Sequence, residues 1–194
     1  DKVRKSIRSP TQLKPRLDRA INRLEGQIQR LDQTSNRLSE RDRSVFAKVV
    51  DAYAKHDAQH ANAFANELTE IRKTEKTVMN ARLALEQITL RLKTVTELGD
   101  MVYALGPVIG VLSSVRTAIT GVLPDAGREL DQIGTELTGI IGDAGQVTGL
   151  SVNFAAPSDD AQKILTEAAT IAEERTKNKF PELPSTTDKP KAQT

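Results

Sequence analysis

The sequence predicts an all-α protein, in which a long antiparallel helical hairpin is followed by three shorter helices. The first observation behind this prediction is that residues 27–98 contain neither glycine nor proline. Helix interiors exclude both, because glycine costs backbone entropy and proline removes a hydrogen-bond donor. The second is a pair of apolar ladders with the seven-residue spacing of packed helices. The third is the composition, with 28% charged and only 3% aromatic residues, which is typical of long helices.

Charge is distributed unevenly along the 194 residues, although the formal net charge is only +2. Residues 1–43 carry 12 basic and 6 acidic side chains, whereas residues 99–194 carry 8 basic and 13 acidic ones. A basic head indicates an anionic partner, and an acidic tail indicates an intramolecular or protein partner. The chain has no cysteine, which rules out disulfides and thiolate chemistry and fits an intracellular protein.

The most apolar window, residues 101–115, is shorter than the roughly 20 residues that a membrane-spanning helix needs. Gly106, Pro107 and Gly110 interrupt it. We therefore expect a buried or interfacial segment. The N-terminus is charged and has no apolar region after it, so no signal peptide is expected.

Residues 1–14 are expected to form a basic tail, and the first helix is expected to begin between Thr11 and Pro15. The apolar ladder of this helix alternates steps of three and four, with Ser35 at one ladder position. Its other members are Leu17, Ile21, Leu24, Ile28, Leu31 and Leu38. Arginines recur every seven residues on one flank, at Arg16, Arg23, Arg30 and Arg37. Acids recur on the other flank, at Asp18, Glu25 and Asp32.

The arginine flank has two interpretations. It could be the solvated edge of a coiled coil that pairs with acids on a neighbour, or it could contact a membrane or another polymer. The basic tail favours an anionic membrane, since each clustered basic residue adds about 1 kcal/mol of attraction. The candidate membrane-binding residues are Lys2, Arg4, Lys5, Arg8, Lys14, Arg16, Arg19 and Arg23.

Six polar residues at 39–44 separate the two ladders and predict the hairpin turn. A continuous helix with a stutter is the alternative. With a turn there, the second helix runs from about Ser44 to Leu98, a length of about 80 Å. The first helix is half as long, so the far part of the second ladder lacks a partner and is expected to contact other subunits. Its members are Phe64, Leu68, Ile71, Val78, Leu85, Ile88, Leu92 and Val95.

Shorter helices follow the hairpin. A third is expected over Met101–Thr120, and a fourth opens at Leu123-Pro124-Asp125, with proline at the first helical position. Residues 15–144 then form the helical core and residues 145–157 a linker. A detached fifth helix spans 158–179, and a proline-containing tail covers 180–194.

Catalytic signatures are weak. His56 and His60 lie four residues apart with Asp57 between them, similar to the zinc motif H-E-x-x-H, but no third ligand is identifiable. Adventitious metal or polymer contacts are favoured there over catalysis. No phosphate-binding loop or nucleophile elbow occurs. Nucleic acid is not expected as a partner, because no aromatic stacking platform accompanies the basic charge. We expect a protein that is not an enzyme and needs no cofactor or metal.

This order of features resembles the ESCRT-III family, and in particular its archaeal cell-division members, the CdvB-type paralogues. The likeness covers the architecture of residues 12–175. It is most specific over Ala84–Asp100, followed by Leu123–Ile141. The resemblance implies a filament-forming subunit that co-polymerises with paralogues. Such a subunit would act at the division site, on the cytoplasmic face of the membrane, and drive constriction and scission.

The tail sequence Phe180-Pro181-Glu182-Leu183-Pro184 resembles the MIT-interacting motif, by which ESCRT-III proteins recruit an AAA ATPase that carries an MIT domain. The resemblance assigns ATPase binding to Phe180, Pro181, Leu183 and Pro184. Proline pre-sets an extended backbone, and the two apolar side chains offer anchors. An ordinary proline-rich tail is the alternative. The chain ends too soon after this motif for the winged helix of one paralogue, so a shorter paralogue is expected.

The charge distribution suggests a mechanism. Acidic segments after residue 99 would fold against the basic hairpin in a closed monomer, and their release would expose the second ladder and the arginine face. Two other functions stay open: a phage-shock-type scaffold that maintains membranes, and a coiled-coil adaptor with no membrane role. Ser9-Pro10 argues against the scaffold, which needs an N-terminal amphipathic helix.

Overall fold

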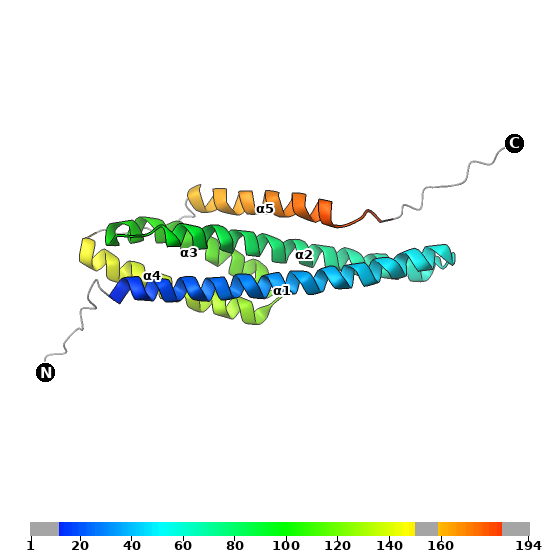
Figure 1. The fold of residues 1–194 in the computed structure, drawn as a ribbon, viewed down its shortest axis with the longest axis horizontal. Helices are drawn as coiled ribbons and strands as arrows, with labels where there is room; N and C mark the ends of the chain where they lie inside the picture. The colour runs from blue at the N-terminus through cyan, green and yellow to red at the C-terminus, as the bar shows by residue number, and fades with distance from the viewer. Residues whose placement is uncertain (1–11, 150–158, 184–194) are drawn as a thin grey trace.

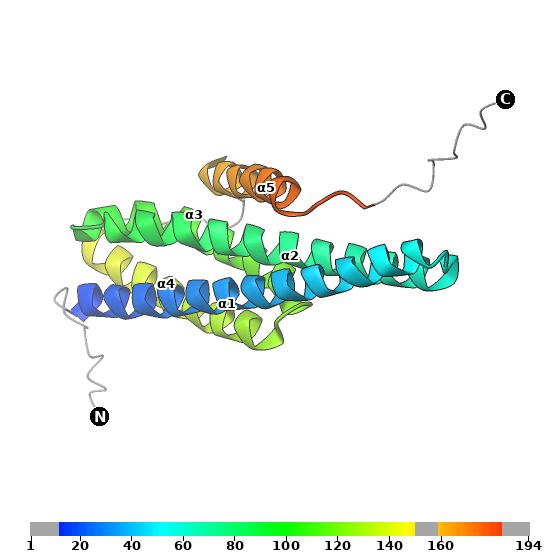
Figure 2. The same ribbon diagram turned by 45° about the vertical axis from the view of Figure 1, so that its right-hand side comes forward.

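The computed structural model describes residues 12–149 and 159–183, which form helices and no strand (Figure 1). The elements are α1 (Leu13–Ala54), α2 (Ala58–Lys93), α3 (Leu98–Thr120), α4 (Pro124–Thr148) and α5 (Asp159–Lys179). Helices α1 and α2 lie side by side in both views and form the long antiparallel hairpin (Figures 1 and 2). The predicted fold class is therefore confirmed.

The hairpin turn lies at residues 55–57, so its prediction at 39–44 was wrong. The polar run 39–44 is part of α1, and its Asp42 occupies a ladder position where it is buried against Arg72 of α2. The ladder keeps its spacing of three and four beyond this point, through Val45, Val49 and Ala52. A buried ion pair therefore interrupts the apolar pattern without interrupting the helix.

The turn itself uses the two-histidine segment. His56 adopts a positive φ of 55°, and Asp57 caps α2 by accepting a hydrogen bond from the His60 backbone N–H at 3.1 Å. The His60 ring also lies 2.7 Å from the Asp57 carboxylate. The hydrogen bonds from the backbone and side chain of His60 lower the pKa of the Asp57 carboxyl. The aspartate between the histidines is thus a helix cap.

The two hairpin helices have similar lengths, 42 residues in α1 and 36 in α2. The expectation that the first helix is half as long as the second, with its far ladder unpartnered, was wrong. Two clusters fill the seam between them. The small one, toward the hairpin turn, contains Val45, Val49, Leu68 and Ile71. The larger one extends into α3, α4 and α5.

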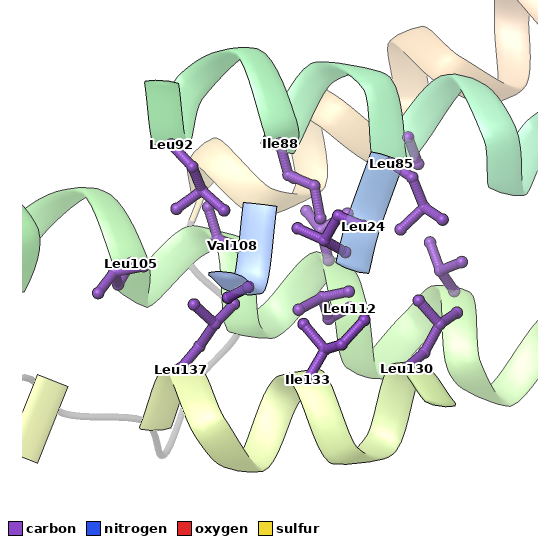
Figure 3. Close-up of a cluster of buried hydrophobic side chains, with 14 of the residues drawn as sticks. Leu24, Leu85, Ile88, Leu92, Leu105, Val108, Leu112, Leu130, Ile133 and Leu137 are labelled. Atoms are coloured by element: carbon purple, nitrogen blue, oxygen red, sulfur yellow. The ribbon is translucent and has the colours of Figure 1, made fainter. Parts of the chain in front are cut away.

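A four-helix core forms where α3 and α4 pack on the hairpin. Leucine and isoleucine side chains from all four helices converge there, as Figure 3 shows for Leu24, Ile88, Leu112 and Ile133. Burying such a side chain contributes about 1.5–3 kcal/mol. This apolar core is the principal stabilising feature of the structure.

Helix α3 continues through Pro107, which is buried, so the apolar window is less interrupted than the sequence suggested. Among the described residues α3 is the one helix that is long and apolar enough to span a membrane. In its most apolar window 39% of the residues are buried, against α2, α4 and α5. The segment is therefore only partly buried in this structure.

Helix α4 extends beyond its predicted end, and helix α5 packs differently from the prediction. α4 continues to Thr148 and ends at Gly149 with a left-handed φ of 72°, so residue 145 lies inside the helix and not in a linker. Helix α5 packs against α2 and α3 and is not detached. Its buried residues are three alanines, Ala161, Ala168 and Ala172. Such small side chains let α5 approach closely, and the larger Ile164, Leu165 and Ile171 are partly buried against the same core.

Candidate functional site

The arginine flank of α1 faces α4. Arg23 donates hydrogen bonds to Glu129 at 2.8 Å and to Glu136 at 3.1 Å. Arg16 donates to Asp143 at 2.6 Å. These contacts give the arrangement expected of a closed monomer, in which an acidic helix covers the basic end of the hairpin.

The acids on α4 repeat with the same period as the arginines on α1. Glu129, Glu136 and Asp143 lie seven residues apart, as do Arg16 and Arg23. Two helices that pack side by side with a common seven-residue period bring such stripes into register. The arginine stripe was predicted from the sequence but this acidic one was not, although its seven-residue spacing is visible there.

Electrostatics at Arg23 favour the charged guanidinium. Burial lowers the pKa of Arg23, but hydrogen bonds and charges from Glu129 and Glu136 outweigh burial and raise the pKa above its ordinary value. Gln132 accepts a further hydrogen bond from Arg23 at 3.1 Å. The positive charge of this arginine is therefore neutralised within the molecule.

The other predicted membrane-binding residues are placed differently. Arg19 is exposed, and Lys14 is exposed beside Asp18 at 3.2 Å. Further along the stripe Arg30 and Arg37 are exposed as well. Four residues lie outside the described part of the chain: Lys2, Arg4, Lys5 and Arg8. In this state the described arginine stripe is thus partly covered and partly accessible.

The predicted polymer contacts are covered in this structure. All of them except Phe64, which is half-buried, are buried at the seam or in the four-helix core. Leu68 and Ile71 pack against α1, and Val78 to Val95 line the larger cluster. Contacts between subunits through this ladder stay a prediction, and they require the helices that cover it to move away.

The predicted ATPase-binding motif lies against the hairpin. Pro181 accepts a hydrogen bond from Arg72 at 2.7 Å, and the Phe180 ring lies beside the same guanidinium. Leu183 packs on the small apolar cluster between α1 and α2. Pro184 lies outside the described residues. The described part of the motif is therefore in contact with the body of the protein.

Buried polar residues at the hairpin seam were not predicted from the sequence. Glu75 is fully buried and accepts hydrogen bonds from Ser35 at 2.5 Å and from Lys179 at 2.8 Å. Asp42 is paired with Arg72. Ser35 and Asp42 both interrupt an apolar ladder at positions that face the partner helix. That interruption is the signal from which these contacts could have been found.

No group of three metal-binding side chains occurs in the ranges 12–149 and 159–183. Both histidines are exposed at the hairpin turn, where His60 contacts the cap residue Asp57. The polar clusters along the helix seams in the same ranges are ion pairs and hydrogen-bonded groups. Such an arrangement can hold helices together or bind charged surfaces.

The chain resembles two curated proteins along most of its length. It is 43% identical over 178 residues to cell division protein B1 of Sulfolobus acidocaldarius, covering 92% of this chain and 83% of that protein. It is 31% identical over 188 residues to cell division protein B of the same organism, covering 95% and 72%. No family model and no solved structure matches. The chain therefore belongs to the ESCRT-III family and is one of its CdvB-type paralogues.

Proposed function

We propose that this protein is a filament-forming, membrane-remodelling subunit of archaeal cell division, with no catalytic activity of its own. Its relatives are named cell division proteins, which supports a role in division. The observation that carries the finer proposal is the arginine face of α1 under the acidic stripe of α4. A surface that is neutralised in the monomer becomes available to an anionic membrane when α4 leaves.

Charge alone does not open the monomer. Partly exposed ion pairs such as Arg23–Glu129 contribute about 0–1 kcal/mol each. An anionic lipid surface offers about 1 kcal/mol per basic residue in their place. The buried isoleucines and leucines of α4 contribute about 1.5–3 kcal/mol each, which lipid headgroups do not replace. Opening therefore needs a second apolar partner, and a neighbouring subunit fits that requirement.

This balance links membrane binding to filament formation. The ladder of α2 and the apolar face of α4 would be exposed together on opening, and a neighbouring subunit would cover them. Co-polymerisation with paralogues follows the same logic, because related chains carry related ladders. The subunit would act on the cytoplasmic face of the membrane at the division site.

Reversing the charge of Arg16, Arg19 and Arg23 together to glutamate should abolish sedimentation of the full chain with vesicles of anionic lipid. These side chains form the described basic face, and their reversal replaces attraction to the lipid by repulsion. The measurement is the sedimented fraction with phosphatidylglycerol–phosphatidylcholine vesicles compared with pure phosphatidylcholine. Unchanged sedimentation of the triple variant would refute the lipid assignment.

The covering role of α4 is tested by neutralising two of its acids. Changing Glu129 and Glu136 to glutamine should increase sedimentation, because it leaves the charge of Arg23 uncompensated and makes opening less unfavourable. Asp131→Asn is the control: it lies on the same helix but pairs with Arg116 of α3 at 3.0 Å. The control should sediment like the unmodified chain.

The tail motif is proposed to recruit an AAA ATPase through its MIT domain. Leu183→Asp should weaken binding of an isolated MIT domain to the full chain, because it places a charge where an apolar anchor is needed. Titration calorimetry measures the affinity. An unaltered affinity would show that Leu183 is not an anchor of this interaction.

A further inference from the structure

A groove with a volume of about 290 Å³ lies between α3 and α4. All of its lining residues belong to these two helices. The deepest of them are Leu112 and Leu130, which are almost fully buried and which Figure 3 shows between the two helices. Ile109 is half-buried beside them. Sites for cofactors and drug-sized ligands usually measure about 300–1,000 Å³, so this groove is better suited to a single side chain.

One rim of the groove carries a positive charge. The Arg116 guanidinium donates to Asp131 at 3.0 Å through one terminal nitrogen, and both side chains are partly exposed. The other nitrogens of Arg116 have no partner among the described residues. A guanidinium has five N–H donors, so Arg116 can bind a second carboxylate in addition to Asp131. The groove thus combines an apolar floor with an available cation.

The same chain presents a side chain that fits this groove. Tyr103 of α3 is 69% exposed, whereas the other aromatic side chains in the described part of the chain are half-buried. Asp100 lies one turn before Tyr103, is exposed, and has no partner among the described residues. Tyrosine and arginine are the residues that, with tryptophan, most often anchor protein interfaces.

The exposed pair and the groove match in chemistry and in spacing. Asp100 and Tyr103 are three positions apart on α3, and Leu112 of the groove floor is four positions from Arg116 on the rim. Residues three or four apart on a helix are neighbours, with β-carbons about 5–6 Å apart. A tyrosine ring on the apolar floor therefore brings a carboxylate one turn away within reach of the guanidinium.

From this match we propose that the groove between α3 and α4 binds Tyr103 and Asp100 of a second copy of the chain. The ring lies on Leu112 and Leu130, and the carboxylate accepts hydrogen bonds from Arg116. Tyr103 does not line the groove of its own chain, so the two surfaces are distinct. A contact between two different surfaces leaves one of each free at the ends of the pair, so further copies can add in a row.

This contact differs from the assembly described under the proposed function. That assembly requires α4 to leave the hairpin, whereas the groove exists only while α3 and α4 are packed together. Closed subunits can therefore join before they open. One ring and one exposed ion pair make a weak contact, since such a pair contributes about 0–1 kcal/mol. The contact becomes effective where many copies are held close together.

Photo-cross-linking tests the contact directly. Benzoylphenylalanine at position 103 keeps an aromatic ring and reacts with the residues that the ring touches. Full-length chains that carry it are mixed, without lipid, with unmodified chains labelled with heavy nitrogen, so that mass spectrometry separates products between copies from products within one copy. Position 103 should be joined to residues 109–116 or 130–138 of the labelled copy. Products within one copy only, or products between copies that map elsewhere, overturn the proposal.

Filling the groove should remove this product. Gly134 lines the groove, and apart from its own stretch of helix no atom lies within 4 Å of the position where its β-carbon would be, so Gly134→Leu fits the fold. The substitution should lower the yield between copies at least about tenfold, as expected when the pocket of an anchoring residue is blocked. Gly142→Leu is the matched control, because Gly142 is an exposed glycine of α4 that is equally free of neighbours and does not line the groove. Equal yields from the two variants overturn the proposal.

A charge swap tests the ion pair while Tyr103 is kept. Arg116→Glu and Asp100→Arg should each lower the association constant about tenfold, because like charges then face each other. Sedimentation equilibrium of the full chain without lipid measures it. The double variant should self-associate like the unmodified chain, and its failure to recover overturns the pairing of Asp100 with Arg116. An unmodified chain that stays monomeric overturns the whole proposal, whereas the proposed function is judged separately by assembly on anionic vesicles.

Discussion

Replacing Arg72 by methionine should lower the free energy of unfolding by about 3–5 kcal/mol. Asp42 is only 2% exposed at the seam of α1, and Arg72 supplies its two charged hydrogen bonds. Without the guanidinium the Asp42 carboxylate stays buried with no counter-ion. The free-energy cost of that uncompensated charge is larger than the net stabilisation that the ion pair provides. Urea unfolding of the full chain, followed by circular dichroism, measures the loss.

Two controls identify the cause of that loss. The double variant Asp42→Leu, Arg72→Met removes the buried charge as well, so its stability should return close to that of the unmodified chain. Arg41→Met breaks the exposed pair with Glu67 at 2.8 Å and should cost no more than about 1 kcal/mol. If Arg72→Met cost as little as Arg41→Met, burial of Asp42 would not determine stability.

The second large effect is expected at Gly127, near the start of α4. A β-carbon there would overlap the Thr120 hydroxyl and would lie 3.2 Å from the Thr120 Cα at the end of α3. The hydroxyl also donates to the Arg116 carbonyl at 2.6 Å, so it does not rotate away without losing that bond. Gly127→Ala should therefore cost about 1–3 kcal/mol in urea unfolding, although alanine is the better helix former.

Gly134→Ala is the matched control on the same helix. Apart from its own stretch of helix, no atom lies within 4 Å of the position where its β-carbon would be. This substitution should stabilise the protein by about 0.5–1 kcal/mol, through the backbone entropy that glycine loses on folding. Effects of equal sign at the two glycines would contradict the close approach of α3 and α4 at Thr120.

The hairpin turn shows where sequence patterns fail. Polar residues at 39–44 have the composition of a turn, whereas the true turn at 55–57 contains no glycine or proline. The difference depends on Arg72, thirty residues from Asp42, because a buried carboxylate is tolerable only where a cation faces it. The residue pattern along α1 alone does not show that Arg72 of α2 faces Asp42.

The misplaced turn had one further consequence. A second helix that began at Ser44 would be longer than its partner, and the excess ladder from Phe64 to Val95 would then need contacts with other subunits. In the structure α1 extends to Ala54 and packs along the part of the ladder near the turn. Helices α3 and α4 cover the remaining part, so the ladder is buried within one chain. Its role between subunits now depends on opening.

The sequence by itself determined the helices and the existence of a hairpin, because helix propensity and seven-residue periodicity are local properties that packing did not override. It also contained both charged stripes, of which the arginines on α1 were recognised and the acids on α4 were not. Only the tertiary structure decided which stripe meets which, where the hairpin turns, and that the segment after α5 contacts Glu75 and Arg72 of α2. Those facts depend on pairs of residues that are distant in sequence, and burial sets their energies once the helices have packed.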